Sequence, residues 1–206
     1  MIRIYKKDVP KELVEYEKSE NASYEGFTQK EAIKHSLMEE QFGLCAYCMG
    51  RINDENMKIE HFKCQSNFPE SQLDYHNMLG CCKGNEGMPY KQQTCDTHKG
   101  DKPLSLNPSL ESDFDKMQIY YSAEGKICSL NEEFDKEINE VLNLNTGLLK
   151  NNRKAMIDSV KKTLSKKSGD RTKSEIEKLI KKYESDHKPY CGAALYYLRK
   201  KLRSAK

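Results

Sequence analysis

The chain has 206 residues, of which 33% are charged and 36% hydrophobic, and its formal net charge is +3. This length suits one domain, or a small domain with an appendage, around a modest apolar core. The first residues lack the apolar stretch of a secretory signal, and no run reaches the roughly 18 apolar residues of a membrane span. We therefore expect a soluble, cytoplasmic protein with no membrane partner.

Charge is distributed unevenly along the chain. Residues 151–206 hold 17 Lys or Arg against 6 Asp or Glu, a balance of +11, whereas residues 1–150 hold 18 against 26, a balance of −8. A basic appendage of this kind is able to lie on nucleic acid and contact backbone phosphates. A solvated helical surface, or a surface that docks a partner protein, explains the same pattern. On the first explanation, the lysines that contact phosphates are Lys161, Lys162, Lys166 and Lys167.

The N-terminal part predicts one strand and two helices. Residues 2–5 (IRIY) are strand-like, and the polar residues 11–19 (KELVEYEKS) are helical in character. A clearer helix start follows at Thr28, where Glu31 three residues later completes a capping box. This second helix is expected to end near residues 41–43. Its apolar residues fit one helical face: Ala32, Ile33, Leu37 and Met38.

The middle of the chain, residues 44–104, is irregular, with many Gly, Asn and Cys residues and little periodicity. Such a segment has too little apolar matter to fold by burial alone, so a bound metal is expected to hold it together. Two short strands are predicted after it, in QIYYS and GKICSL, on either side of an Ala-Glu-Gly turn.

From residue 132 onward the pattern is helical. Residues 168–170 (SGD) predict a loop, and Lys188–Pro189 separates a last helix from the one before it. One face is marked only roughly, by Leu149, Arg153, Ile157, Val160 and Leu164. A second face follows the i, i+3, i+4, i+7 spacing cleanly, with Ile176, Leu179, Ile180 and Tyr183. The last helix carries three leucines, Leu195, Leu198 and Leu202.

Eight cysteines are a high number for a chain without a secretory signal, where cysteine clusters bind metal more often than they form disulfides. Cys45-Ala-Tyr-Cys48 is a C-x2-C turn that points two thiolates at one ion, although redox motifs share it. A second pair can be drawn from Cys82 and Cys95, which makes four sulfur ligands for tetrahedral zinc. The twelve-residue gap in this second pair is unusual, and buried or incidental cysteines are the alternative. Spacing alone leaves open whether Cys81 or Cys82 is the ligand.

A carboxylate and a histidine, Glu60 and His61, stand side by side between the two cysteine pairs, in the segment IEHF. Apolar neighbours on both sides are typical of a strand end, where adjacent side chains point to different faces. One of the two can then hold an ion while the other faces a substrate. Asn77 follows sixteen residues after His61, and Asp96 comes directly after Cys95. Taken singly, each of these is equally consistent with an ordinary surface polar residue.

Together these blocks resemble the HNH, or ββα-metal, nuclease motif. The segments LMEEQFGLCAYCMGRI, IEHFKCQS, LDYHNMLGCCKGN and CDTHKGD with LNP are similar to a bacterial group of HNH nucleases, called PtuB-like, of retron and Septu anti-phage systems. The specific match covers residues 36–108. The resemblance implies an α+β fold in which residues 1–130 form a zinc-stapled ββα-metal core with an N-terminal helix. Residues 131–206 then form a basic helical C-terminal region.

The resemblance also implies a role for each residue of the site. Glu60 is the acidic ligand of a catalytic Mg²⁺ or Mn²⁺, and His61 is the general base that deprotonates a water. Asn77 orients the imidazole by hydrogen bonding, and Asp96 is the second protein ligand, at the start of a short helix. Cys82, five residues after Asn77, joins the other three cysteines around zinc. Hard oxygen ligands suit the first ion and soft thiolates the second.

This chain departs from the family pattern in three places. Asp96 stands where many HNH nucleases carry His or Asn. His98, two residues later, could replace or assist it, although helical positions two apart diverge by about 200°. Cys64 stands where the group has proline, and we interpret it as a free thiol near the site. The roles of the other cysteines outside the set stay open: Cys81, Cys128 and Cys191.

The implied function is metal-dependent hydrolysis of nucleic-acid phosphodiesters, with DNA as the default substrate, by the effector of an anti-phage complex. The implied partners are a PtuA-like ATPase and, in retron settings, a reverse transcriptase with its msDNA. The alternatives are an RNA nuclease of the same system, acting for example on tRNA, or a non-catalytic zinc module that binds nucleic acid or protein. The non-catalytic module has no need of the four polar site residues in register. A C-x2-C redox protein would need a βαβ setting that the sequence does not suggest.

Overall fold

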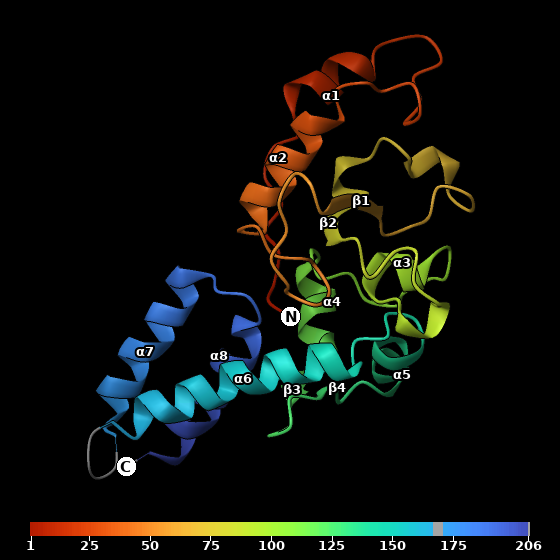
Figure 1. The fold of residues 1–206 in the computed structure, drawn as a ribbon. Helices are drawn as coiled ribbons and strands as arrows, with labels where there is room; N and C mark the ends of the chain where they lie inside the picture. The colour runs from red at the N-terminus through yellow and green to blue at the C-terminus, as the bar shows by residue number, and fades with distance from the viewer. Residues whose placement is uncertain (167–170, 206) are drawn as a thin grey trace.

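The computed structural model describes residues 1–166 and 171–205. The predicted loop at 168–170 and Lys167 lie outside these ranges. The described chain is an α+β fold, in which two small antiparallel sheets of two strands each lie among helices α1 to α8 (Figure 1). The expected class is therefore confirmed at this level.

The N-terminal segment is tied to the core without forming the expected strand. Residues 2–5 belong to no strand, although the amide of Ile4 donates to the carbonyl of Pro108 at 3.0 Å and the Ile4 side chain is buried. The apolar residues of IRIY are thus used for burial. One backbone hydrogen bond does not make a ladder, so the strand prediction is wrong.

The two N-terminal helices are α1 (Lys11–Tyr16) and α2 (Lys30–Glu40). The capping box predicted at Thr28 is wrong, because the N-cap of α2 is Gln29 and no side chain caps it. The helix begins one residue too late for the Thr28 hydroxyl to cap it. The predicted core face is confirmed by the complete burial of Ile33 and Leu37.

The central hairpin consists of β1 (Met57–His61) and β2 (Met78–Cys82), paired antiparallel with Met57 opposite Cys82 and His61 opposite Met78. The strand end predicted at IEHF is therefore confirmed. Both α2 and the short helix α3 (Cys95–Lys99) contact β2. Three single 3-10 turns lie in the connections: η1 (Pro69–Ser71), η2 (Tyr75–Asn77) and η3 (Tyr90–Gln92).

The C-terminal half contains the second predicted hairpin and most of the helical residues. In Figure 1, α6 runs from beside α5 toward the part of the molecule where α7 and α8 pack together. The elements are α4 (Glu111–Met117), β3 (Ile119–Tyr121), β4 (Ile127–Ser129), α5 (Glu132–Glu140), α6 (Gly147–Leu164), α7 (Lys173–Asp186) and α8 (Cys191–Ser204).

Buried apolar residues form one main cluster and two smaller ones. The main cluster joins residues before position 130 with residues of α5, α6 and α8, such as Phe134, Ile157 and Ala193. A smaller cluster lies among α6, α7 and α8, around Val160 and Ile176. The division of the chain at residue 130 stays a prediction. None of the helices in the described ranges is both long and apolar enough to cross a membrane.

Arg153 occupies the buried face of α6, where the sequence pattern placed it among apolar residues. It is 2% exposed, and its guanidinium donates to the carbonyls of Gly125 at 2.7 Å and Leu144 at 2.5 Å, and to the Asn145 side chain at 3.2 Å. Gly125 has φ +79, and an added Cβ would lie 2.2 Å from the carbonyl of Lys150. The β3–β4 turn therefore packs directly onto α6, with Arg153 joining the two.

Replacing Arg153 by Met should lower the free energy of unfolding by about 3 kcal/mol, because it leaves buried carbonyls without a donor. Urea unfolding followed by circular dichroism would measure this loss. The adjacent Lys154 has an exposed side chain, so Lys154→Met should leave the unfolding midpoint almost unchanged. Equal loss in the two variants would contradict the role given to Arg153.

Candidate metal centre and active site

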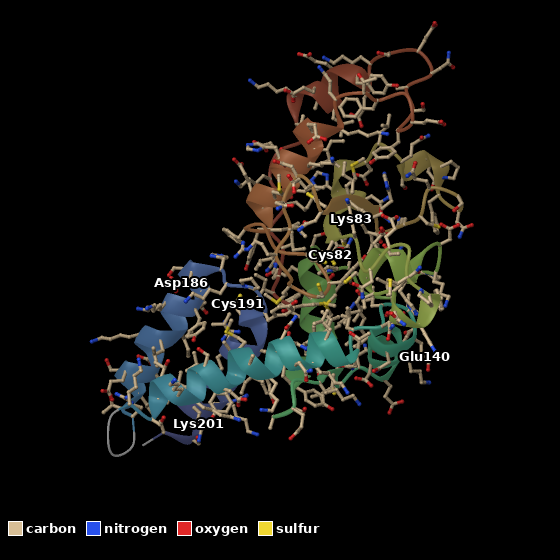
Figure 2. All side chains as sticks on the ribbon, viewed as in Figure 1. Cys82, Lys83, Glu140, Asp186, Cys191 and Lys201 are labelled. Carbon is tan, nitrogen blue, oxygen red and sulfur yellow. The ribbon has the colours of Figure 1, made fainter. Side chains whose placement is uncertain are left out.

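Four cysteine sulfurs from three separate segments meet in one cluster. Cys45 and Cys48 lie on the turn after α2, Cys82 is the last residue of β2, and Cys95 is the first residue of α3. The Sγ–Sγ distances are 3.8 Å for Cys45–Cys95, 3.8 Å for Cys48–Cys82 and 3.7 Å for Cys82–Cys95, and all four atoms lie within 4.8 Å of one another. Cys82, labelled in Figure 2, lies near the middle of the molecule.

The spacing of these sulfurs fits a tetrahedral metal site. A tetrahedron with Zn–S bonds of about 2.3 Å has edges of about 3.8 Å, whereas the two sulfurs of a disulfide are about 2.05 Å apart. All eight cysteines carry free thiols. Burial disfavours the charged form of Cys45, yet hydrogen bonds from neighbouring thiols hold its pKa well below the usual range. The cluster is therefore able to bind a zinc-type ion.

The C-x2-C turn is fixed to β2 by a buried glutamine that the sequence analysis did not identify. The Gln41 amide donates to the carbonyls of Leu44 at 2.8 Å and Gly80 at 2.7 Å, and its Oε1 accepts from the Gly80 amide at 2.7 Å. The Ala46 amide also donates to the Gly80 carbonyl, at 2.9 Å. These bonds set the position of the first cysteine pair relative to the strand that ends in Cys82.

The long gap between Cys82 and Cys95 is a loop that closes on itself. The amide of Thr94 donates to the carbonyl of Gly84 at 2.9 Å. Gly84 has φ +54, and a Cβ there would lie 2.0 Å from the Thr94 carbonyl oxygen, so only glycine fits this closure. Cys95 itself has φ +56, and its amide donates to the Leu142 carbonyl at 2.9 Å.

The remaining cysteines lie outside the four-sulfur cluster. Cys81 is fully buried on β2 opposite Lys58, and burial raises the pKa of its thiol well above the usual range. Cys64 lies beside the candidate active site, where its Sγ is 3.5 Å from the Asp101 carbonyl oxygen. Cys128 and Cys191 are buried elsewhere in the fold.

Next to the cluster lies an open cavity of about 360 Å³ lined by polar side chains. Three of the predicted site residues line it: Glu60 and His61 from the end of β1, and Asp96 from the first turn of α3. The strand order and the helix after it bring these residues together from positions up to 36 apart in the sequence. Lys58, Cys64 and Gln65 are also part of the lining.

Glu60 is a buried carboxylate, and both of its side-chain partners contact the same oxygen, Oε1. Tyr47 donates its hydroxyl to Oε1 at 3.0 Å, and the Lys99 ammonium lies 2.9 Å from the same oxygen. Lys99 and Glu60 are 1% and 3% exposed. Burial and the adjacent Asp96 carboxyl raise the pKa of Glu60 well above its usual range, while Lys99 opposes this shift. The proximity of the two carboxyl groups therefore favours a shared cation or a proton between them.

The structure fixes the tautomer of His61. Its Nε2 lies 2.9 Å from the carbonyl oxygen of Gln72, which only accepts, so Nε2 carries the proton of the neutral ring. Nδ1 is then the unprotonated nitrogen, 3.2 Å from the Gln65 amide nitrogen. The ring of Tyr24 packs edge-on against the imidazole, with 4.5 Å between centroids. Burial lowers the pKa of His61, which favours the neutral form of the ring.

Asn77 bonds the backbone of the loop after His61 instead of the imidazole, which corrects the expected contact. Its Oδ1 accepts from the Lys63 amide at 2.8 Å, and its Nδ2 donates to the carbonyls of Lys63 at 3.0 Å and Ser71 at 3.2 Å. The imidazole nitrogens form hydrogen bonds with Gln72 and Gln65, which both lie in this loop. Asn77 thus acts on the loop that supplies both partners of the ring.

His98 points away from the carboxylate pair. Its Nδ1 is 2.8 Å from the carbonyl oxygen of Val141, and its ring stacks on Tyr90 with 4.0 Å between centroids. Asp96 and Thr97 are the residues of α3 that line the cavity. Of the two candidates for a second oxygen or nitrogen ligand, the geometry favours Asp96.

Several residues of the site were not identified from the sequence. Lys58 lies two residues before Glu60 on the same strand, so strand alternation would have placed it on the same face. Tyr47 stands inside the C-x2-C turn, and Gln65 lies four residues after the end of β1. The sequence around Lys99 did not indicate a role in the site, because a lysine in a short polar helix is normally solvated.

No family model matches this chain. The Septu protein PtuB of Bacillus thuringiensis is 28% identical over 100 residues, which cover 47% of this chain and 37% of that relative. The match thus spans little more than a third of the relative's length.

Replacing Cys82 by Ser should reduce the zinc content of the purified protein from about one ion per chain toward zero, because one of four thiolates is lost. Elemental analysis together with thermal unfolding would measure the loss of metal and of stability. Cys81→Ser is the matched control, since its sulfur lies outside the cluster. Retention of zinc by the Cys82 variant and its loss from the Cys81 variant would contradict the assignment.

Proposed function

We propose that this chain is a metal-dependent endonuclease of the HNH type that hydrolyses phosphodiester bonds of nucleic acid, with DNA as the expected substrate. The observation that carries the proposal is the convergence of Glu60, Asp96 and His61 on one open cavity beside a four-sulfur cluster. The order of β1, β2 and α3 is that of a ββα-metal core.

Glu60 and Asp96 are the residues that would hold a divalent ion. The donor chemistry fits, since two adjacent carboxylates suit Mg²⁺ or Mn²⁺ and the raised pKa of Glu60 reflects burial and an unscreened neighbouring carboxyl. When bound, such an ion stabilises negative charge on the phosphoryl oxygens. Tyr47 and Lys99 both contact Oε1 of Glu60, which leaves Oε2 as the oxygen for the ion.

His61 would act as the general base through Nδ1. The Gln72 carbonyl holds the proton on Nε2, so the free electron pair of the neutral ring is on Nδ1. A water that replaces the Gln65 amide at Nδ1 would give up its proton there and attack phosphorus. The P–O bond to the leaving sugar oxygen would then break, and that oxygen would take up a proton from solvent. Asn77 keeps the loop of Gln65 and Gln72 in place, and in this way it positions the base.

The name of the relative supports a role in Septu anti-phage defence. On that basis we propose a PtuA-like ATPase as the partner. In a retron system, the same complex would also contain a reverse transcriptase and its msDNA. The basic helices of residues 131–206 would either dock this partner or lie on backbone phosphates. The proposal that this region is a separate unit from the nuclease core rests on its charge and helical pattern.

Cleavage by the purified, zinc-loaded protein tests the proposal. With Mg²⁺ or Mn²⁺, duplex DNA and total RNA should be offered in parallel, and the wild type should cut at least one. His61→Ala should slow cutting by about 10² to 10⁴-fold, because the base is lost. His35→Ala, on the exposed side of α2, should cut like the wild type.

Each alternative gives a different result in this assay. Cleavage of RNA alone identifies the RNA nuclease. Tight binding of nucleic acid without cleavage by the protein or its complex with the ATPase identifies the non-catalytic zinc module. Undiminished cutting by His61→Ala contradicts the mechanism.

The pH dependence of cleavage should report the ionisation of His61. Burial lowers the pKa of His61 below its ordinary 6.5, and only the neutral ring accepts a proton. The rate should therefore rise with pH at acidic pH and reach half of its maximum below pH 6.5. Initial rates between about pH 5 and about pH 8 would measure this. A half-maximal rate above pH 6.5 would contradict it.

A further inference from the structure

Lys58 places a second ammonium group at the carboxylate pair, on the open side of the site. Its Nζ lies 3.2 Å from Oδ2 of Asp96, 3.2 Å from Oε1 of Glu86 and 3.4 Å from Oγ1 of Thr97. It is on β1 two residues before Glu60, so both side chains leave the strand on the same face. All of these residues line the 360 Å³ cavity.

The two lysines of the site differ in their freedom to move. Lys99 is 1% exposed and bonds Glu60 and the carbonyls of His61 and Gly100, so its ammonium is enclosed by protein. The Lys58 side chain is 32% exposed, and its other carboxylate partner, Glu86, is 55% exposed on the loop between Cys82 and Cys95. Lys58 alone of these two is able to follow a ligand that enters the cavity.

Lys58 contacts Oδ2 of Asp96, an oxygen that a divalent ion at the carboxylate pair would use. An ion bound to Asp96 would stand close to the ammonium, and like charges at such a distance repel. The four-carbon stem of lysine lets the ammonium rotate away while it stays at the cavity. Lys58 keeps Glu86 as a carboxylate partner, and a backbone phosphate of a bound substrate would be a further anion, which an ammonium binds as a point charge.

We propose that Lys58 is a phosphate-contact residue that exchanges partners during the reaction cycle. It neutralises Asp96 before the divalent ion binds, and it contacts a phosphate of the nucleic-acid substrate once the ion has taken Asp96. This inference rests on the proposed nuclease function, and it assigns to one side chain opposite effects on the two ligands. Lys58 opposes binding of the ion and favours binding of the nucleic acid.

The opposite effects give a test that does not depend on activity. In zinc-loaded protein without nucleic acid, Lys58→Met should tighten Mn²⁺ binding by on the order of fivefold, measured from free Mn²⁺ by electron paramagnetic resonance. Lys58→Arg keeps the charge and should bind Mn²⁺ like the wild type. Lys102→Met removes a lysine that contacts Tyr90 instead of the carboxylates, and it should also leave Mn²⁺ affinity unchanged.

Nucleic-acid binding is measured in the His61→Ala background at saturating Mn²⁺, with duplex DNA as the probe. Adding Lys58→Met should weaken binding and reduce the slope of log affinity against log salt by about 0.9, the value for one phosphate contact. Unchanged Mn²⁺ affinity, an unchanged salt slope, or weaker binding of both ligands would overturn the proposal, the last because it indicates a structural role.

The two proposals fail in different ways. If the wild type binds Mn²⁺ and cuts nucleic acid while Lys58→Met changes neither measurement, the role of Lys58 is wrong and the nuclease function stands. If the wild type binds neither Mn²⁺ nor nucleic acid, the nuclease function is wrong and the role of Lys58 falls with it.

Discussion

The four-sulfur cluster is the constraint on which the rest of the site depends. Residues 44–104 contain long irregular connections and only short strands and helices, so few regular hydrogen bonds hold them. The cluster joins the turn after α2, the end of β2 and the start of α3, and it adds to the hydrogen bonds by which Gln41 and Ala46 link the first two. Bound metal would close these loops in the folded state, and its binding energy would then be part of the folding energy.

The metal centre and the carboxylate pair are coupled through neighbouring residues. Tyr47 stands between Cys45 and Cys48 in the sequence, and its hydroxyl bonds Glu60. Asp96 directly follows Cys95. The sulfur cluster therefore positions Asp96 directly, whereas Glu60 is held on β1 and is linked to the C-x2-C turn through Tyr47. Lys58 and Lys99 offset only part of the negative charge of Glu60, Asp96 and Glu86.

The sequence predicted the elements that carry chemistry better than the details of their contacts. Spacing and resemblance indicated Glu60, His61, Asp96 and the cysteines, because ligand types and strand alternation leave a local signal. The capping box at Thr28 failed because a capping pattern does not determine at which residue a helix begins. The partner of Asn77 could not be predicted, since it depends on where the loop after His61 returns. Lys99 was missed because its burial arises only from tertiary packing.

The left-handed backbone of Cys95 has a consequence for how the protein matures. A φ of +56 is costly for a residue with a side chain, by about 1 to 2 kcal/mol, and here the Leu142 hydrogen bond and the sulfur cluster maintain it. If the four sulfurs hold an ion, a chain without that ion lacks one of these two restraints, and rotation at Cys95 would carry Asp96 and Lys99 away from Glu60 together. On the proposed function, a newly synthesised chain would be harmless to the chromosome of its own cell until metal insertion completes the fold.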